Sequence, residues 1–426
     1  MNERARRLSV PRLPFGPRKA ASVVFLVAAA LMFGIFTIAG KTGPTAYLLA
    51  VWSGAFAVFV AYRLSYFAET VMVTLPGATS PRAERLRRTT GRQRLMPDAE
   101  PSYLSAQEAN SSDHEVRLEE RVIGIEVNGH AIAYPLAAMS VREIAHEIMD
   151  GTHVFVTWWP VTYAARAFVV TPKDDADPAL LPVRKTLLNS SILADGSGSE
   201  IVQFLGQAVT GPRAGQTLRQ IPAVSTNWRA WSGAFPQTEV MSLDGTPDVD
   251  IFERYYVTDR AGLYQQSSRD RRWHDKDTVL GLEVDGESRA YPYPALIRRP
   301  LVNDELGGEP ILIAHERVSA TAVAFSRVVN GRTLTFSGDS RNPIRPQAAP
   351  GDSDISTRIN YEPWFLVDSQ TGSRWRAVNG ECVSGELKGT RLQTLAGQTS
   401  FWFAWSRFYP GTDVLEPVNQ PRDEQG

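Results

Sequence analysis

The chain contains an internal repeat, and this repeat limits the possible folds more than any other feature of the sequence. Residues 122–168 align without a gap onto residues 279–325, at a constant offset of 157 residues. Residues 198–240 align in the same way onto residues 372–414 at an offset of 174, so the later copy carries 17 extra residues between the two blocks. A period this long exceeds the unit of a solenoid. We therefore expect two tandem homologous domains.

Each copy opens with a pattern typical of a β-hairpin. Apolar residues alternate along residues 123–127 and 280–284, which lead into Asn128-Gly129 and Asp285-Gly286. Both dipeptides favour the two-residue turns that join antiparallel strands. The pattern that follows predicts a short helix and then a buried strand, at residues 138–149 and 153–158 of the first copy, with a strand at 310–314 of the second.

The end of each copy predicts short strands punctuated by glycine and then a closing helix. The expected strands are residues 202–205, 208–210, 374–378 and 381–384. The closing helices carry tryptophans three residues apart, namely Trp228 and Trp231, then Trp402 and Trp405. This spacing puts each pair on one helical face, where we expect the indoles to pack against a sheet. A sugar-stacking platform is the alternative. The fold class we predict is mainly β (α+β), with short helices.

Two apolar runs precede the repeats. Residues 20–40 hold no charged side chain, and a helix of this length crosses a hydrocarbon core of about 30 Å. Residues 44–62 form a second run, and the connector between the runs is so short that we expect an antiparallel transmembrane hairpin. The alternatives are a signal peptide for the first run and a buried core helix for the second.

Basic residues flank the hairpin on both outer sides, whereas the connector offers only Lys41. Because Lys and Arg accumulate on the cytoplasmic side, we expect both ends to be cytoplasmic and the protein to lie in a bacterial inner membrane. An extracytoplasmic placement of the later domains is the alternative, since most of the second basic cluster lies far from the span. The expected organisation is a basic N-terminus (1–19), the hairpin (20–67), a linker (68–94), the two repeat domains (95–243 and 244–418) and a tail (419–426).

Composition excludes several classes of function. The 45 Lys+Arg residues balance 46 Asp+Glu residues, so the basic footprint of a nucleic-acid binder is missing. Cys382 is the only cysteine, which excludes an intrachain disulfide and any Cys-x-x-Cys site. The sequence also lacks a P-loop, a dinucleotide-binding glycine motif, a nucleophile elbow and a His-Glu-x-x-His motif. We therefore expect no cofactor, no catalytic residue of these classes and no metal site.

Several short motifs recur in order along both copies. In the second copy they are residues 288–292 (SRAYP), 368–375 (DSQTGSRW), 385–392 (GELKGTRL) and 400–415, which begins with Ser400 and carries both tryptophans. This order resembles the family known as domain of unknown function 3179, over residues 95–418. The family is uncharacterised, so the resemblance implies no reaction.

The resemblance also implies a site that this chain has lost. The family carries Cys-Pro-Leu-Cys at a position where the first copy reads Trp159-Pro160-Val161-Thr162 and the second reads Glu316-Arg317-Val318-Ser319. Two thiols on one turn can hold a soft metal or form a disulfide, whereas these residues can do neither.

Other side chains were considered as replacement ligands. On the predicted helix, Glu143 and Glu147 lie at i, i+4 with His146 beside them, a spacing that could chelate a hard cation. A solvated acidic helix face is the simpler interpretation. In the second copy, His315, Glu316 and Ser319 occupy the altered turn, where the simpler interpretation is a turn with one satisfied histidine.

The sequence thus predicts a membrane-anchored, non-catalytic binding or scaffolding protein. Its expected partners are the lipid bilayer, through residues 20–62, and an unidentified protein or small molecule, but no nucleic acid. Small residues in the hairpin leave an oligomer open. The alternative function is an enzyme or metal-handling protein with a remodelled site around His315, Glu316 and Ser319, or across the interface with Trp158 and Trp159.

Overall fold

The computed structural model describes residues 51–52, 54–56, 69–78, 80–88, 100–111, 116–170, 179–246, 249–264, 270–340 and 364–416. The chain divides into two compact units, residues 1–71 with 83–90 and residues 72–82 with 91–426. Strands β1 (Glu69–Val73) and β2 (Arg82–Arg88) occupy the segment 68–94 that the sequence analysis interpreted as a linker.

The expected N-terminal segment 1–19, the tail 419–426 and nearly all of the expected hairpin lie outside the described residues. Residues 51–52 and 54–56, within the second apolar run, are helical. Among the residues described, no helix has the length and apolar character needed to cross a bilayer.

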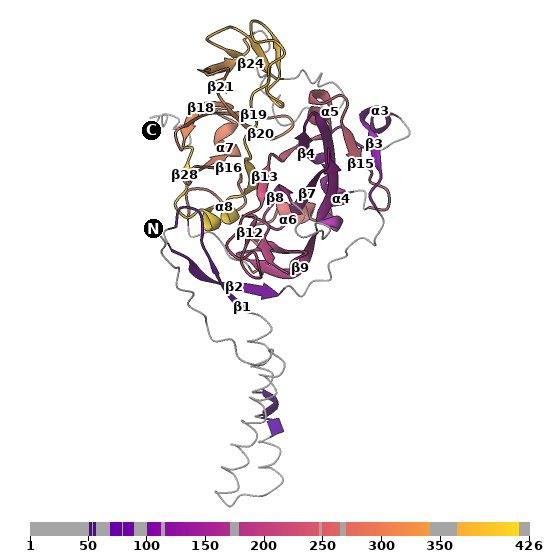
Figure 1. The fold of residues 1–426 in the computed structure, drawn as a ribbon, viewed down its shortest axis with the longest axis vertical. Helices are drawn as coiled ribbons and strands as arrows, with labels where there is room; N and C mark the ends of the chain where they lie inside the picture. The colour runs from indigo at the N-terminus through magenta and orange to yellow at the C-terminus, as the bar shows by residue number, and fades with distance from the viewer. Residues whose placement is uncertain are drawn as a thin grey trace, which may run out of the picture. The chain divides into compact units, whose positions relative to one another are not determined.

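The second unit consists of β-sheets and short helices, which confirms the mainly β prediction (Figure 1). We call its residues 100–243 the first half and 244–416 the second half. The elements of the first half are β3 (Tyr103–Ser105), α3 (Ala106–Ala109), β4 (Arg121–Val127), β5 (His130–Pro135), α4 (Leu136–Arg142), β6 (Ile144–Met149), β7 (Thr152–Trp159), β8 (Ala164–Val169), β9 (Leu180–Leu187), β10 (Ser190–Asp195), β11 (Glu200–Val202), β12 (Gln207–Ala208), β13 (Arg219–Ile221), β14 (Val224–Asn227), α5 (Trp228–Ala234) and β15 (Glu239–Met241).

The second half follows a similar order. Its elements are α6 (Glu253–Tyr256), β16 (Thr278–Val284), β17 (Glu287–Pro292), α7 (Tyr293–Leu296), β18 (Leu301–Leu306), β19 (Glu309–Glu316), β20 (Thr321–Ser326), β21 (Val328–Val329), β22 (Arg332–Thr333), β23 (Phe336–Gly338), β24 (Phe365–Asp368), β25 (Arg374–Arg376), β26 (Cys382–Ser384), β27 (Gln398–Phe401), α8 (Trp402–Phe408) and β28 (Asp413–Val414).

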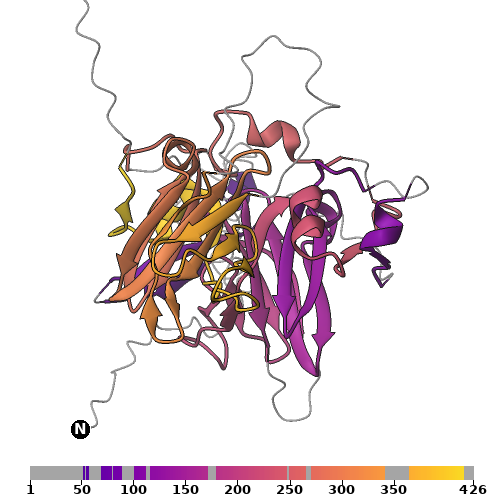
Figure 2. The same ribbon diagram turned by 90° about the horizontal axis from the view of Figure 1, so that it is seen from above.

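The main sheets of the two halves have matching strand orders. The first half forms a sheet in the order β14-β4-β5-β15-β3 and the second half one in the order β27-β16-β17-β28. In both sheets the first pairing, β14 with β4 or β27 with β16, is antiparallel, and β15 or β28 pairs in parallel with β5 or β17. The first sheet then adds β3, which is antiparallel to β15. A second sheet joins β6, β7 and β8 in one half and β18, β19 and β20 in the other. Seen from above, the halves lie side by side, the first in magenta and the second in orange and yellow (Figure 2).

Both predicted hairpins are present. Strand β4 pairs with β5 and β16 with β17, in antiparallel registers that close at Val127↔His130 and Val284↔Glu287. Asn128 and Asp285 adopt positive φ, as do the glycines that follow them, which is the geometry that a two-residue hairpin turn requires.

The predicted helix over residues 138–149 is wrong beyond Arg142. Helix α4 ends there because Glu143 takes a φ of 64°, and the chain continues as strand β6. Strand β6 pairs along its whole length with the buried strand β7. Pairing with a core strand outweighed the weak helical preference of residues 144–149.

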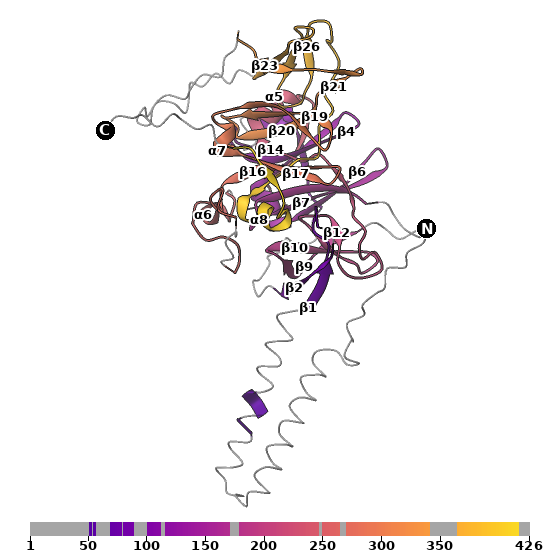
Figure 3. The ribbon, with the colours of Figure 1, turned by 90° about the vertical axis from the view of Figure 1, so that its left-hand side faces the viewer.

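The closing helices pack on the main sheets, as Figure 1 shows for α5 beside β4 and Figure 3 for α8 near β16. All four tryptophans on these helices are buried, which contradicts the sugar-stacking alternative. The Trp231 indole donates to Thr238 Oγ1 at 2.9 Å, and the Trp405 indole donates to Thr412 Oγ1 at 3.0 Å.

Glycine at positions 124 and 281 makes this packing possible. A Cβ built on Gly124 would lie 2.3 Å from the Trp231 ring, and one on Gly281 would lie 2.2 Å from the Trp405 ring. The strand must therefore carry no side chain where the indole crosses it.

We expect Gly124→Ala to destabilise the fold by about 1–3 kcal/mol, because the new methyl group overpacks the Trp231 ring. Gly233→Ala is the matched control, since Gly233 lies in α5 and its added Cβ would have no atom within 4 Å. In a helix this change is expected to be neutral or to stabilise by up to about 1 kcal/mol. Chemical denaturation measures both, and an unchanged unfolding midpoint for Gly124→Ala would contradict the packing.

Candidate functional site

The residues at the two positions where the resemblance implies cysteines form two turns of the same kind. One turn joins β7 to β8 after the pair Trp159↔Ala164, and the other joins β19 to β20 after the pair Glu316↔Thr321. The last residue of each turn, Tyr163 or Ala320, has a positive φ. The two turns are therefore equivalent in backbone as well as in sequence position.

The first turn is closed and buried. Trp159 is 8% exposed, and its indole donates to the Asn189 carbonyl at 2.7 Å. Thr162 is fully buried and its hydroxyl lies 3.5 Å from the Trp159 carbonyl, a weak contact at most. The preceding Trp158 is also buried and donates to Ser140 Oγ at 3.3 Å. These side chains pack the turn onto its own half.

The second turn is organised by the Glu316 carboxylate. One oxygen accepts from the Val318 backbone N–H at 2.8 Å, and the other accepts from the Ser319 N–H at 2.7 Å and from the Ser319 hydroxyl. Ser319 Oγ also shares a hydrogen bond of 2.6 Å with Thr321 Oγ1. Glu316 is only 8% exposed, and both of its carboxylate oxygens accept hydrogen bonds from the turn itself.

His315 lies beside this turn as a neutral, buried side chain. It is 2% exposed, and its ring packs edge-to-face on Tyr293 with centroids 5.0 Å apart. Burial, with a smaller effect of Arg317, lowers its pKa to about 4. Its Nδ1 has no hydrogen-bond partner among the described residues. The structure thus brings His315, Glu316 and Ser319 together, but inside the protein.

Each turn is held by the opposite half of the protein. The Phe401 backbone N–H, where β27 meets α8, donates to the Thr162 carbonyl at 2.9 Å. In the corresponding place, the Arg121 guanidinium donates to the Ser319 carbonyl. Strand β27 contacts β8 and strand β14 contacts β20, so the two arrangements are reciprocal. The two turns therefore form part of the interface between the halves.

The first-half candidates Glu143 and His146 do not form a cation site with Glu147. On strand β6, His146 is exposed and stacks on Phe155, while Glu147 faces the other way and accepts from the Tyr103 hydroxyl. Burial lowers the pKa of His146 and raises that of Glu147. Glu143 is buried at the end of α4. No group of three or more His, Cys, Asp or Glu suited to a metal occurs within the described residues.

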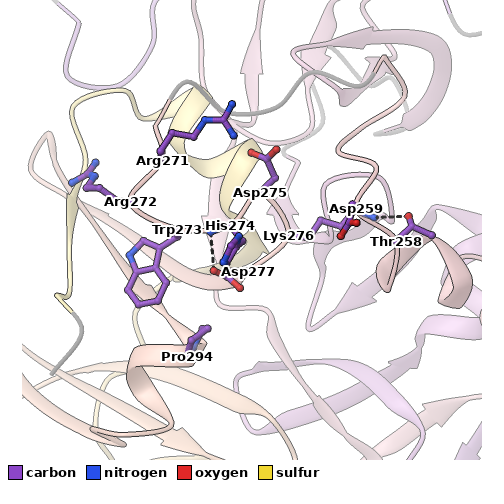
Figure 4. A pocket seen from close by; sticks show the side chains of 10 residues that line it. All are labelled: Thr258, Asp259, Arg271, Arg272, Trp273, His274, Asp275, Lys276, Asp277 and Pro294. Atoms are coloured by element: carbon purple, nitrogen blue, oxygen red, sulfur yellow. Dashed lines mark hydrogen bonds between the residues drawn. The ribbon is translucent and has the colours of Figure 1, made fainter. Parts of the chain in front are cut away.

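A cleft of about 740 Å³ lies elsewhere, in front of the N-terminal end of β16 (Figure 4). The residues that line it are Thr258, Asp259, Arg271, Arg272, Trp273, His274, Asp275, Lys276, Asp277 and Pro294. The Lys276 ammonium lies 3.3 Å from the centroid of the Tyr255 ring and also donates to the Tyr255 carbonyl. Partial burial lowers the pKa of Lys276 to about 8. Arg272 is ion-paired with Asp270 at 2.6 Å.

A second cavity, of about 450 Å³, lies between the halves. Arg166 of β8 and Gln207 of β12 line it from the first half, and Glu283 of β16 and Tyr409 line it from the second. Arg166 is only 5% exposed, and its Nη1 donates to Gln398 Oε1 at 2.7 Å.

Comparison with known families decides the relationship of the chain. The model of a protein family of unknown function, DUF3179, matches residues 97–412. The chain belongs to the DUF3179 family. No curated protein and no solved structure matches it. Membership in DUF3179 assigns the chain to a family whose function is unknown, so it indicates no activity.

Sequence reasoning missed two cationic side chains that line the cavities of this DUF3179 protein. Lys276 sits in a polar segment with no motif around it, so nothing singled it out. A signal for Arg166 was available, because the aligned residue of the second copy is Val323. A charge that replaces valine within a buried strand marks a position with an unusual environment.

We expect Glu316→Ala to destabilise the protein by about 1.5–3 kcal/mol, because the N–H groups of Val318 and Ser319 would lose their charged acceptor, and Ser319 is buried. Glu386→Ala is the control, since Glu386 is 60% exposed and pairs with Arg332 at the surface. That change is expected to stay within about 0.5 kcal/mol. Equal unfolding midpoints for the two variants would contradict the structural role of Glu316.

Proposed function

We propose that this DUF3179 protein is a membrane-anchored, non-catalytic binding protein built from two tandem copies of one β-rich domain. One observation carries the proposal. Both turns at the positions where the resemblance implies cysteines contact the opposite half, and the Glu316 carboxylate already accepts hydrogen bonds from donors of its own turn. In this chain, the turns at these positions hold the two halves together.

The duplication is supported by register as well as by sequence. In the antiparallel pairings, Val224 pairs with Gly124 and Gln398 pairs with Gly281. In the parallel pairings of β15 with β5 and of β28 with β17, Val240 pairs with Ala133 and Val414 pairs with Ala290. Each pair in the first half maps onto the pair in the second at the two offsets found by alignment.

Metal analysis of the purified protein tests the non-catalytic part of this proposal. We expect zinc, copper and iron to be substoichiometric in the wild type and in Glu316→Gln, which keeps the size of the side chain. One equivalent of metal in the wild type that is lost in Glu316→Gln would overturn the proposal and favour the metal-handling alternative.

The membrane anchor and its orientation are supported by the two apolar runs and their basic flanks. In the second run the described residues are helical, with Val51, Trp52 and Phe56 at 52%, 73% and 66% exposure. Apolar side chains this exposed are suited to contact with lipid. We place the folded halves on the cytoplasmic side of the inner membrane.

A cysteine at an exposed position tests this orientation. Lys388 is exposed, whereas the natural Cys382 is buried and gives little background. We expect an impermeant maleimide to label Lys388→Cys only after the cells are permeabilised, with wild type as the control. Strong labelling in intact cells would place the halves outside the cytoplasm.

A further inference from the structure

The cavity between the halves contains a buried charge that has no direct ion pair among the described residues. Arg166 is 5% exposed, and its Nη1 donates to the neutral amide oxygen of Gln398 at 2.7 Å. Its Nε has no partner, and no ion pair to Arg166 occurs within the described parts of the chain. A buried guanidinium that no carboxylate contacts directly is costly to maintain. Burial accordingly lowers the pKa of Arg166, while the nearby Tyr409 and Glu283 oppose this effect.

The fold itself does not require an arginine at this position. Arg166 pairs with Thr157 across strands β8 and β7, and the equivalent pair in the second half is Val323 with Ala314. Val323 is 3% exposed and packs in an apolar core. The same strand position carries a valine in the other half, so the pairing of these strands does not depend on the charge of Arg166.

Other polar atoms at this end of the interface also lack partners. Gln207 Oε1 and Gln398 Nε2 are buried and unsatisfied among the described residues. Glu283 and Tyr409 also line the cavity, and the Tyr409 hydroxyl donates to Glu283 Oε2 at 3.1 Å. Buried groups of this kind normally have a hydrogen-bond partner. Arg166, Gln207 and Glu283 line one cavity of about 450 Å³, a size suited to a small molecule, and Gln398 lies behind Arg166. This arrangement indicates a binding site.

We propose that this cavity binds a small organic monocarboxylate, with its carboxylate on the Arg166 guanidinium. The planar guanidinium matches a carboxylate, and charge-assisted hydrogen bonds of this type are strong. Leu205, Leu218 and Trp405 supply an apolar wall for the rest of the ligand. Glu283 on the same cavity would repel a second negative charge, so dicarboxylates are disfavoured. The inference rests on the proposed binding function and names its ligand class.

Benzoate and hexanoate, with benzamide as the neutral analogue, are the probes for a calorimetric titration of the full chain in detergent. We expect at least one of the two carboxylates to bind the wild type, more tightly than benzamide does. Arg166→Val, which installs the residue of the equivalent position, is expected to weaken carboxylate binding by about tenfold or more. Arg166→Gln serves as a second variant if the valine form does not fold.

Arg391→Val is the matched control, because Arg391 is a 42% exposed arginine paired with Glu126, away from the residues that line the cavity. It should bind the carboxylate as the wild type does. Failure of both carboxylates to bind the wild type, or equal binding by the folded Arg166 variant, would overturn the inference. Either result leaves the metal analysis unchanged, so it is distinguishable from failure of the proposed function.

Discussion

A backbone hydrogen bond from Phe401 to Thr162 joins the two halves, and the guanidinium of Arg121 reaches the Ser319 carbonyl at the equivalent place. Each half therefore supplies the partner for a buried carbonyl in the other. A buried carbonyl without a partner would cost about 1–3 kcal/mol. Thr226 and Thr321 add a hydrogen bond of 2.6 Å between the halves, and Phe204 stacks on Phe408 with centroids 4.4 Å apart. Strands, turns and closing helices all depend on this reciprocal contact.

The joint also explains what the altered turns do. In the second turn a carboxylate binds the two N–H groups and the hydroxyl of its own turn, and in the first an indole anchors the turn to Asn189. A carboxylate thus stabilises one turn and an indole N–H the other, although the two turns have the same backbone shape. The halves differ at Arg166, where the aligned position holds valine, and Arg166 lines a cavity between the halves.

Much of the fold could be predicted from the sequence because local rules and the repeat agreed. Asn128-Gly129 and Asp285-Gly286 fixed the hairpins through the φ values that their turns need, and the tryptophan spacing indicated the packed helix faces. Residues 144–149 were mispredicted because the hairpin signal Asp150-Gly151 was not used: both residues take positive φ and join β6 to β7. The sequence placed a turn at each of these positions, but the contacts of the turns with the opposite half, such as Phe401 with Thr162, could not be predicted from it. Arg166 could be recognised as a candidate binding residue only from the alignment with Val323 and the cavity that it lines, taken together.

Differential scanning calorimetry of the full chain in detergent tests the central claim that the two halves form one structure through this joint. If each half completes the other, the calorimetric enthalpy of the folded region should equal the van't Hoff enthalpy of a single transition. Two separate transitions, one for each half, would contradict the account.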